Sequence, residues 1–279
     1  MRIARVSKDG VTGLAAKVGD KVTVVFDAAL ADLDAQIAAG TLAEAGAKAA
    51  AGAAIAEAAL TFLPPVARPS KIVCLGLNYR DHAEESGLGI PEFPVLFARF
   101  PSSLIGHGAP IVLPRVSEQL DWEAELVVVL SKGGKNIAQA DALNHVAGYS
   151  VFNDASIRDY QMRTPQWTAG KNFDDTGAFG PWLVTPDELP AGAAGLKIEC
   201  RLDGAVMQSS NTANLIFDVA TTIEILSGFM TLAAGDVLVM GTPGGVGIAR
   251  KPQVWMKAGQ TCEVEIEGVG LLVNPIVAE

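Results

Sequence analysis

Short apolar runs that end in glycine, proline or asparagine dominate the chain from residue 71 onward. Runs of this length with such ends are typical of β-strands. The clearest are KIVCLGL, PVLFARF, EAELVVVL, LKIECRL and DVLVM. The best helical segment, residues 212–227, has the three- and four-residue spacing of an amphipathic helix at Ile216, Val219, Ala220, Ile223 and Leu226. Because strands and helices do not alternate regularly, the pattern predicts a mostly-β (α+β) core, shaped as a barrel, roll or sandwich, with a few peripheral helices.

Residues 1–66 follow a different pattern. RIARV and KVTVVF have the composition of short strands, and residues 28–60 are about half alanine, which favours one or two helices. The stretch PPVARPS at 64–70 is typical of a connector. We therefore predict a small N-terminal α+β domain over 1–66 and a larger catalytic β-roll domain over 67–279.

Composition and charge narrow the class of protein. The chain has 279 residues, 49% of them hydrophobic and 19% charged, with a net charge of −10. An acidic chain without a basic stripe is not expected to bind nucleic acid or an anionic membrane surface. The three cysteines form no CxxC pair, and neither an apolar leader nor an apolar run of membrane-spanning length is present, so we expect a cytoplasmic protein.

Three carboxylates lie at the start of the most apolar strand, in LDWEAELVVVL. Alternate side chains of a strand share a face, so Asp121, Glu123 and Glu125 are expected to project together, on a face that continues into Val127 and Val129. One interpretation is an acidic strand end in contact with solvent. The other is a cation that compensates buried carboxylates, and an all-oxygen ligand set suits Mg²⁺, Mn²⁺ or Ca²⁺ better than zinc.

Further polar residues are candidate partners of these carboxylates. Asp154 follows a strand and is either a third ligand or a helix N-cap, and Arg158 and Gln161 lie on the same helical face as Asp154. His82 and Glu85 are expected to be neighbours on a helical turn. They are either a general base with the group that orients it, or part of a solvated polar turn.

Two more segments can contribute to such a site. Lys171 lies between a glycine and an asparagine. It either neutralises the charge of an enolate or is an ordinary surface lysine. The loop GTPGGVG offers the Gly241 backbone and the Thr242 hydroxyl to a carboxylate, or is an ordinary tight turn. It lacks the residues of a P-loop or a dinucleotide fingerprint.

Over roughly residues 70–275, the chain resembles the fumarylacetoacetate hydrolase family. The matching stretches, in order, are GLNYRDHAEE, LDWEAELVVVL, NDASIRDYQ, WTAGKNFD, GPWLVTPDEL, MQSSNTANLIF and GDVLVMGTPGGVG. The resemblance implies a β-sandwich-like roll, a homodimer, and an Mg²⁺ or Mn²⁺ ion. It implies Glu123, Glu125 and Asp154 as ligands, with Asp121 not required to touch the metal. It also implies a His82–Glu85 lid dyad, and substrate binding by Lys171, Arg158, Gln161 and Thr242. Asn78, Met240 and residues 175–178 depart from the family pattern.

Together with these residues, the resemblance implies a metal-dependent hydrolase that cleaves a carbon–carbon bond in a small β-diketo 2-oxo acid, such as an acylpyruvate in the breakdown of aromatic compounds. His82, oriented by Glu85, would activate water, and the cation and Lys171 would stabilise the enolate. The same enolate serves a decarboxylase of an oxaloacetate-like acid or an isomerase of an unsaturated diacid. A non-catalytic binding protein is the third alternative.

Overall fold

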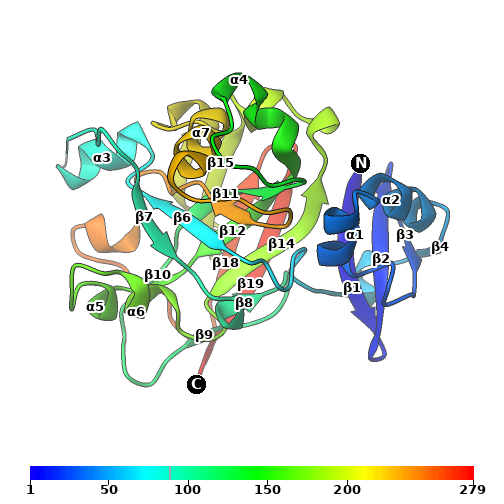
Figure 1. Ribbon diagram of the computed structural model, residues 1–279. Coiled ribbons are helices and arrows are strands. Elements are labelled where there is room, and N and C mark those ends of the chain that lie inside the picture. Colours follow the sequence, from blue (N-terminus) through cyan, green and yellow to red (C-terminus); the bar gives the residue numbers. More distant parts are fainter. Residues whose placement is uncertain (88) are drawn as a thin grey trace.

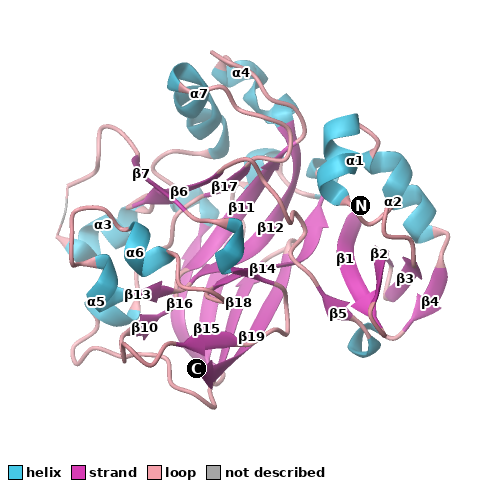
Figure 2. Ribbon diagram, turned by 60° about the horizontal axis from the view of Figure 1, so that its bottom comes forward, coloured by secondary structure: helices cyan, strands magenta, loops and turns pink. Residues whose placement is uncertain are grey.

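The computed structural model describes residues 1–87 and 89–279. Two packed β-sheets form the core of the molecule (Figure 2). The larger sheet has the order β4-β3-β2-β1-β14-β12-β11-β17-β6-β7, with β5 paired to β1 and β8 paired to β14. The smaller one has the order β16-β15-β18-β19-β9, and a separate ribbon pairs β10 with β13. The prediction of a mostly-β roll with few helices is confirmed.

The larger sheet is built from strands along the whole chain. Its N-terminal strands are β1 (Arg2–Lys8), β2 (Val11–Val18), β3 (Lys21–Val25), β4 (Ala53–Ile55) and β5 (Thr61–Phe62). Its remaining strands are β6 (Ile72–Gly76), β7 (Val95–Ala98), β8 (Leu104–Ile105), β11 (Ala124–Leu130), β12 (Val146–Asp154), β14 (Gly177–Val184) and β17 (Val237–Val239).

The smaller sheet and the ribbon consist of short strands from the middle of the chain and longer strands from its C-terminal part. They comprise β9 (Ile111–Leu113), β10 (Leu120–Asp121), β13 (Ser156–Ile157), β15 (Lys197–Leu202), β16 (Ala205–Asn211), β18 (Thr261–Ile266) and β19 (Gly270–Ala278).

Strand β11 is apolar on both faces because both faces are covered. Every residue of β11 is buried. Leu126 and Val128 pack in the cluster that contains Ile198 of the smaller sheet, whereas Val127 and Val129 pack in a second cluster on the opposite face. A strand that is buried on both sides has a continuous hydrophobic sequence. A carboxylate at the end of such a strand is buried as well.

The first part of the chain forms the predicted α+β appendage. Helices α1 (Leu33–Ala39) and α2 (Leu42–Ala50) cover strands β1 to β4, to one side of the core (Figure 1). The alanine-rich stretch thus holds two helices, followed by the short strand β4 and by a 3-10 turn at Glu57–Ala59. Strand β1 continues the larger sheet by pairing with β14, Arg2 opposite Val184. The division at residue 66 stays a prediction.

The remaining helices are short and lie at the edges of the core. They are α3 (Arg80–Ser86), α4 (Gln139–Ala142), α5 (Arg158–Gln161), α6 (Thr168–Lys171) and α7 (Val219–Phe229). The helix predicted over 212–227 therefore begins later than expected, because Asp218 caps it by accepting a hydrogen bond from Thr221 N at 2.8 Å. In the described part of the chain, the helices are too short or too polar to cross a membrane.

Candidate active site and metal centre

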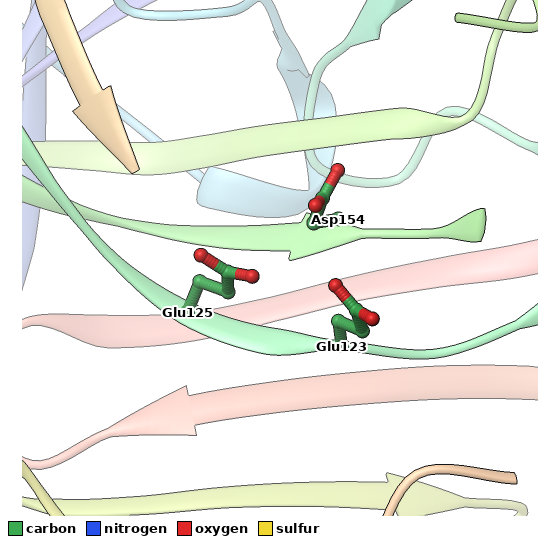
Figure 3. A group of neighbouring side chains, drawn as sticks. All are labelled: Glu123, Glu125 and Asp154. Atoms are coloured by element: carbon green, nitrogen blue, oxygen red, sulfur yellow. The ribbon is translucent and has the colours of Figure 1, made fainter. Parts of the chain in front are cut away.

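Three carboxylates converge where β11 and β12 run side by side. Glu125 lies in β11, Glu123 directly before it, and Asp154 ends β12. The pairing of Ala124 with Asn153 brings Asp154 beside Glu123, whose carbonyl accepts a hydrogen bond from Asp154 N at 2.9 Å. One oxygen of each carboxylate lies within 4.8 Å of the others, and all three residues are buried (Figure 3). Asp154 is not a helix cap, because α5 begins at Arg158 and has Ile157 at its N-cap position.

Buried cations pair with these carboxylates, two of them from short helices. The Lys171 ammonium lies 2.6 Å from Glu123 Oε2 and 2.6 Å from Asp154 Oδ2. The Arg158 guanidinium lies 2.7 Å from Glu123 Oε1. The lysine side chain is 1% exposed, so the alternative of a surface lysine is wrong. Short helices α5 and α6 carry these two cations to the strand ends.

The electrostatic balance differs among the three acids. Burial opposes ionisation of Glu123, but Lys171 and Arg158 overcome it and lower the pKa of Glu123 to about 2. Burial, reinforced by Asp154 and Glu123, raises the pKa of Glu125 well above its usual value. Its carboxylate accepts a hydrogen bond from Gly241 N at 2.5 Å. An ionised Glu125 therefore requires a further positive charge beside it.

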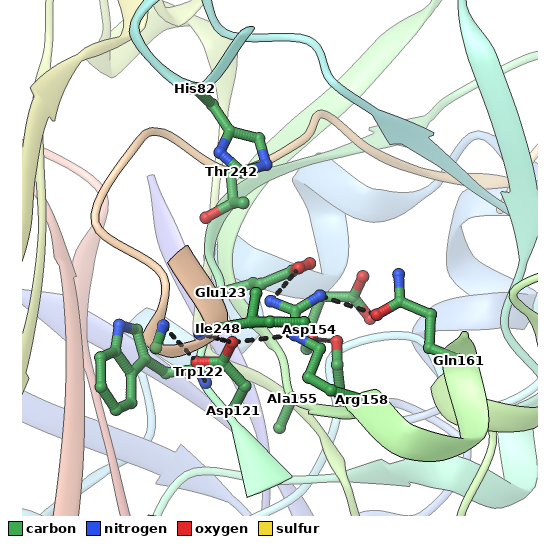
Figure 4. A network of polar contacts seen from close by, with 12 residues as sticks. His82, Asp121, Trp122, Glu123, Asp154, Ala155, Arg158, Gln161, Thr242 and Ile248 are labelled. Carbon is green, nitrogen blue, oxygen red and sulfur yellow. Dashed lines mark hydrogen bonds and ion pairs between the residues drawn. The ribbon is translucent and has the colours of Figure 1, made fainter. Parts of the chain in front are cut away.

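Asp121 does not share the site with Glu123 and Glu125, contrary to the expectation that all three project together. Strand β10 ends at Asp121 and β11 begins at Ala124, and this break turns the aspartate aside. Its carboxylate accepts hydrogen bonds from Arg158 Nε at 2.8 Å, Gly247 N at 2.7 Å and Ile248 N at 3.0 Å (Figure 4). Asp121 thus holds Arg158 and the glycine-rich loop in place.

The predicted dyad forms on α3. His82 Nδ1 lies 3.4 Å from Glu85 Oε2, and His82 lowers the pKa of Glu85. Both oxygens of Glu85 also accept the Gly245 N–H at 3.0 Å. These contacts connect α3 to the glycine-rich loop and orient the imidazole, which lies above Thr242 (Figure 4).

One cavity of about 220 Å³ joins these groups. Its polar lining comprises His82, Glu123, Glu125, Arg158, Gln161, Lys171 and Thr242. Leu77, Phe97, Met162, Trp167 and Ile248 are among its apolar walls. Polar groups at one end and apolar walls around them are the usual build of a small-molecule site.

Gly241 was predicted to offer its backbone N–H to the substrate. Instead, this N–H donates a hydrogen bond to Glu125 and so positions the Glu125 carboxylate. The φ of Gly241, 89°, is a left-handed conformation, and a Cβ there would lie 2.8 Å from the Cβ of Asn78. Asn78, buried, donates to Met240 O at 2.8 Å and to Phe217 O at 3.0 Å, so it ties segments together.

Two buried residues near the site escaped the sequence reasoning. Arg99 is fully buried and pairs with Asp154. Gln208 of β16 contacts the Thr242 hydroxyl at 2.8 Å. The position of Arg99 inside the apolar run PVLFARF indicates a buried ion pair, because a buried arginine needs a carboxylate partner. Gln208 gave no such signal, since a glutamine in a strand is usually solvated.

The residues present fit a hard divalent cation. The three carboxylates provide only oxygen ligands and are buried, and burial together with the other two acids disfavours an ionised Glu125 without a further cation. Mg²⁺ and Mn²⁺ prefer such ligands, and within the described residues this group has none of the histidine or cysteine ligands that zinc favours.

Known proteins resemble this chain in sequence and in fold. A family model described as fumarylacetoacetate (FAA) hydrolase C-terminal matches residues 71–277. The mitochondrial oxaloacetate tautomerase Fahd2a of Rattus norvegicus is 45% identical over 224 residues, which are 80% of this chain and 71% of the relative.

Two solved structures extend the likeness to the whole chain. Fumarylacetoacetate hydrolase from Exiguobacterium antarcticum has a TM-score of 0.88 at 32% identity, with 100% of both chains covered. A 5-carboxymethyl-2-hydroxymuconate delta-isomerase from Mycobacterium smegmatis has a TM-score of 0.79 at 29% identity, covering 100% of this chain and 99% of that one.

Proposed function

Because this chain belongs to the fumarylacetoacetate hydrolase family, we propose that it enolises a small 2-oxo acid, and that its reaction is the keto–enol tautomerisation of an oxaloacetate-like diacid. The observation that carries the proposal is one cavity lined by Glu123 and Glu125 of the three-carboxylate centre, by the buried Lys171 ammonium and by the His82 imidazole. The 45% identity to a protein named oxaloacetate tautomerase supports this choice of substrate.

Glu123, Glu125 and Asp154 would hold the cation. When bound, a divalent cation supplies a Lewis acid that withdraws electrons from a 2-oxo group and so acidifies the neighbouring carbon. Lys171 keeps a positive charge beside this centre, since Asp154 and Glu123 outweigh burial and raise its pKa. The ammonium therefore stabilises negative charge that develops on the enolate oxygen.

Gln161 and His82 supply a donor and a proton carrier. Arg158 Nη1 donates to Gln161 Oε1 at 2.8 Å, which turns the Gln161 Nε2 donors toward the substrate. Glu85 engages His82 at Nδ1, so that Nε2 is the nitrogen that takes a proton from the carbon next to the 2-oxo group and returns it to oxygen. The apolar walls exclude water from this exchange.

The test follows the decay of enol oxaloacetate by its ultraviolet absorbance, with Mg²⁺ or Mn²⁺ present, and monitors pyruvate by proton NMR. We expect enzyme-dependent decay of the enol without pyruvate formation. Glu123→Gln abolishes the acceleration, whereas the same substitution at the exposed Glu118 leaves it intact. A decay rate equal to that of metal and buffer alone would contradict the proposal, and release of pyruvate would identify a decarboxylase.

A second candidate is hydrolysis of a carbon–carbon bond in an acylpyruvate. The His82–Glu85 pair favours it, because an imidazole oriented by a carboxylate can also activate a water molecule. Incubation of an acylpyruvate with the metal-loaded protein, followed by proton NMR, reads the result directly. Pyruvate and a free carboxylic acid are expected from hydrolysis, and only solvent exchange of the acidic protons from enolisation.

Our proposal extends to the assembly and setting of the protein. It includes a homodimer without nucleic-acid or membrane partners, and a cytoplasmic place in aromatic-compound breakdown. Light scattering of the purified metal-loaded protein measures the mass, and a monomeric mass would contradict the dimer. The rat relative is mitochondrial by its name, so the location needs fractionation of the native cells.

A further inference from the structure

Gln208 connects the carboxylate strand to the glycine-rich loop. Its side chain is buried, with an exposed fraction of 1% for the residue. Gln208 Oε1 accepts a hydrogen bond at 2.9 Å from the backbone N–H of Ala124, the residue between Glu123 and Glu125. Gln208 Nε2 lies 2.8 Å from the Thr242 hydroxyl oxygen and 2.8 Å from the Pro243 carbonyl oxygen.

These partners leave the amide only one orientation. A backbone N–H can only donate, so the amide atom that faces Ala124 must be the oxygen. The Pro243 carbonyl can only accept, so the atom that faces the loop must be the nitrogen. Nε2 has two protons, and one goes to Pro243 while the other goes to Thr242.

The orientation of the amide determines that of the Thr242 hydroxyl. A hydroxyl that accepts from Nε2 directs its own single proton away from that nitrogen. Thr242 is buried and lines the cavity beside Glu123, and within the described chain its hydroxyl makes no hydrogen bond as a donor. The hydroxyl proton is therefore available to an acceptor in the cavity.

From this geometry we infer that Gln208 is a positioning residue, which holds the Thr242 hydroxyl as a hydrogen-bond donor for an anionic oxygen of the substrate. The inference rests on the proposed function, since it assigns the carboxylate of the 2-oxo acid to this donor. A hydroxyl turned the other way would present lone pairs to that carboxylate and repel it. Gln208 thus favours anions over neutral analogues such as the corresponding amide.

The test is a double-mutant cycle on oxalate binding. Oxalate presents the adjacent carboxylate and second oxygen of a 2-oxo acid, and calorimetry of the Mg²⁺-loaded protein measures its dissociation constant without catalysis. Gln208→Met has a similar length and removes both roles of the amide, Thr242→Val removes the hydroxyl, and Thr242→Ser keeps it. Melting temperatures of all variants report the loss of the Ala124 contact, which is common to both backgrounds and cancels in the cycle.

Gln208→Met should weaken oxalate binding about threefold to tenfold in the wild-type and Thr242→Ser backgrounds, but less than about twofold with Thr242→Val. In turnover, KM for the 2-oxo acid should rise more than kcat falls. Equal weakening in both the Thr242→Ser and Thr242→Val backgrounds would make Gln208 merely structural and overturn the inference. If the wild type binds oxalate but enolises no 2-oxo acid, the proposed function fails while the cycle still decides the role of Gln208.

Discussion

The Arg99–Asp154 pair provides the most direct quantitative test of the centre. Arg99 follows β7, and both side chains of the pair are 0% exposed. Besides Asp154, the guanidinium donates to Thr176 Oγ1 at 2.7 Å, to Ser103 Oγ at 3.2 Å and to Ala155 O at 3.2 Å. Arg99→Met keeps the length and removes the charge and all four contacts.

The expected cost follows from this burial. Lys171 remains beside Asp154, but it also serves Glu123, so one carboxylate charge is left without its partner. Removing one member of a buried ion pair costs about 3–5 kcal/mol. An unfolding entropy of about 2.1 cal/mol/K per residue corresponds to about 0.6 kcal/mol/K for this chain, so the melting temperature should fall by about 5–9 °C.

Differential scanning calorimetry in EDTA measures this shift without a contribution from bound metal. The matched control is Arg163→Met, because Arg163 is exposed and its guanidinium carbon lies 3.6 Å from the centre of the Tyr160 ring. That change should lower the melting temperature by less than about 2 °C. The double variant Arg99→Met/Asp154→Asn should lose less than the sum of its single changes, since both charges are then removed. An Arg99→Met protein that melts within about 2 °C of the wild type would refute the reasoning.

Three further predictions concern the site chemistry. Glu123→Gln should remove metal-dependent turnover while the circular dichroism spectrum is unchanged, and an active variant without added metal would disprove the cation centre. His82→Ala should slow tautomerisation about 10²- to 10⁴-fold while oxalate binding stays within about threefold, and full activity would exclude His82 as the proton carrier. The raised pKa of Glu125 means that the metal-free carboxyl keeps its proton to higher pH, so cation binding should release a proton and tighten as pH rises. Calorimetry in two buffers of different ionisation enthalpy measures this release, and a pH-independent affinity would contradict it.

Local spacing in the sequence was sufficient for the elements that carry the chemistry. The apolar run after Glu125 predicts a strand buried on both faces, and β11 is one. The three-residue spacing of His82 and Glu85 predicts neighbours on a helical turn, and α3 brings them to 3.4 Å. These features depend on backbone periodicity over a few residues, which neighbouring side chains encode directly.

Other features depended on residues far apart in the chain. One ionic partner of Asp154, Arg99, lies 55 positions away, and the partner of Ala124 N, Gln208, lies 84 positions away. A break of two residues before β11 sent Asp121 to Arg158 and the glycine-rich loop, although alternation predicts that it faces the same way as Glu123.

The physical reason is the difference between periodicity and pairing. Strand and helix periods determine which residues share a face, so the amino-acid sequence by itself determined the mostly-β core and the carboxylates at the end of its central strand. Which cation or amide meets each buried polar group is decided by how the sheets pack and where a strand is interrupted. Only the tertiary structure therefore determined that Arg99 and Gln208 complete the centre and that Lys171 pairs with Glu123 and Asp154. Each buried charge or N–H must be satisfied by whatever the fold brings within about 3 Å.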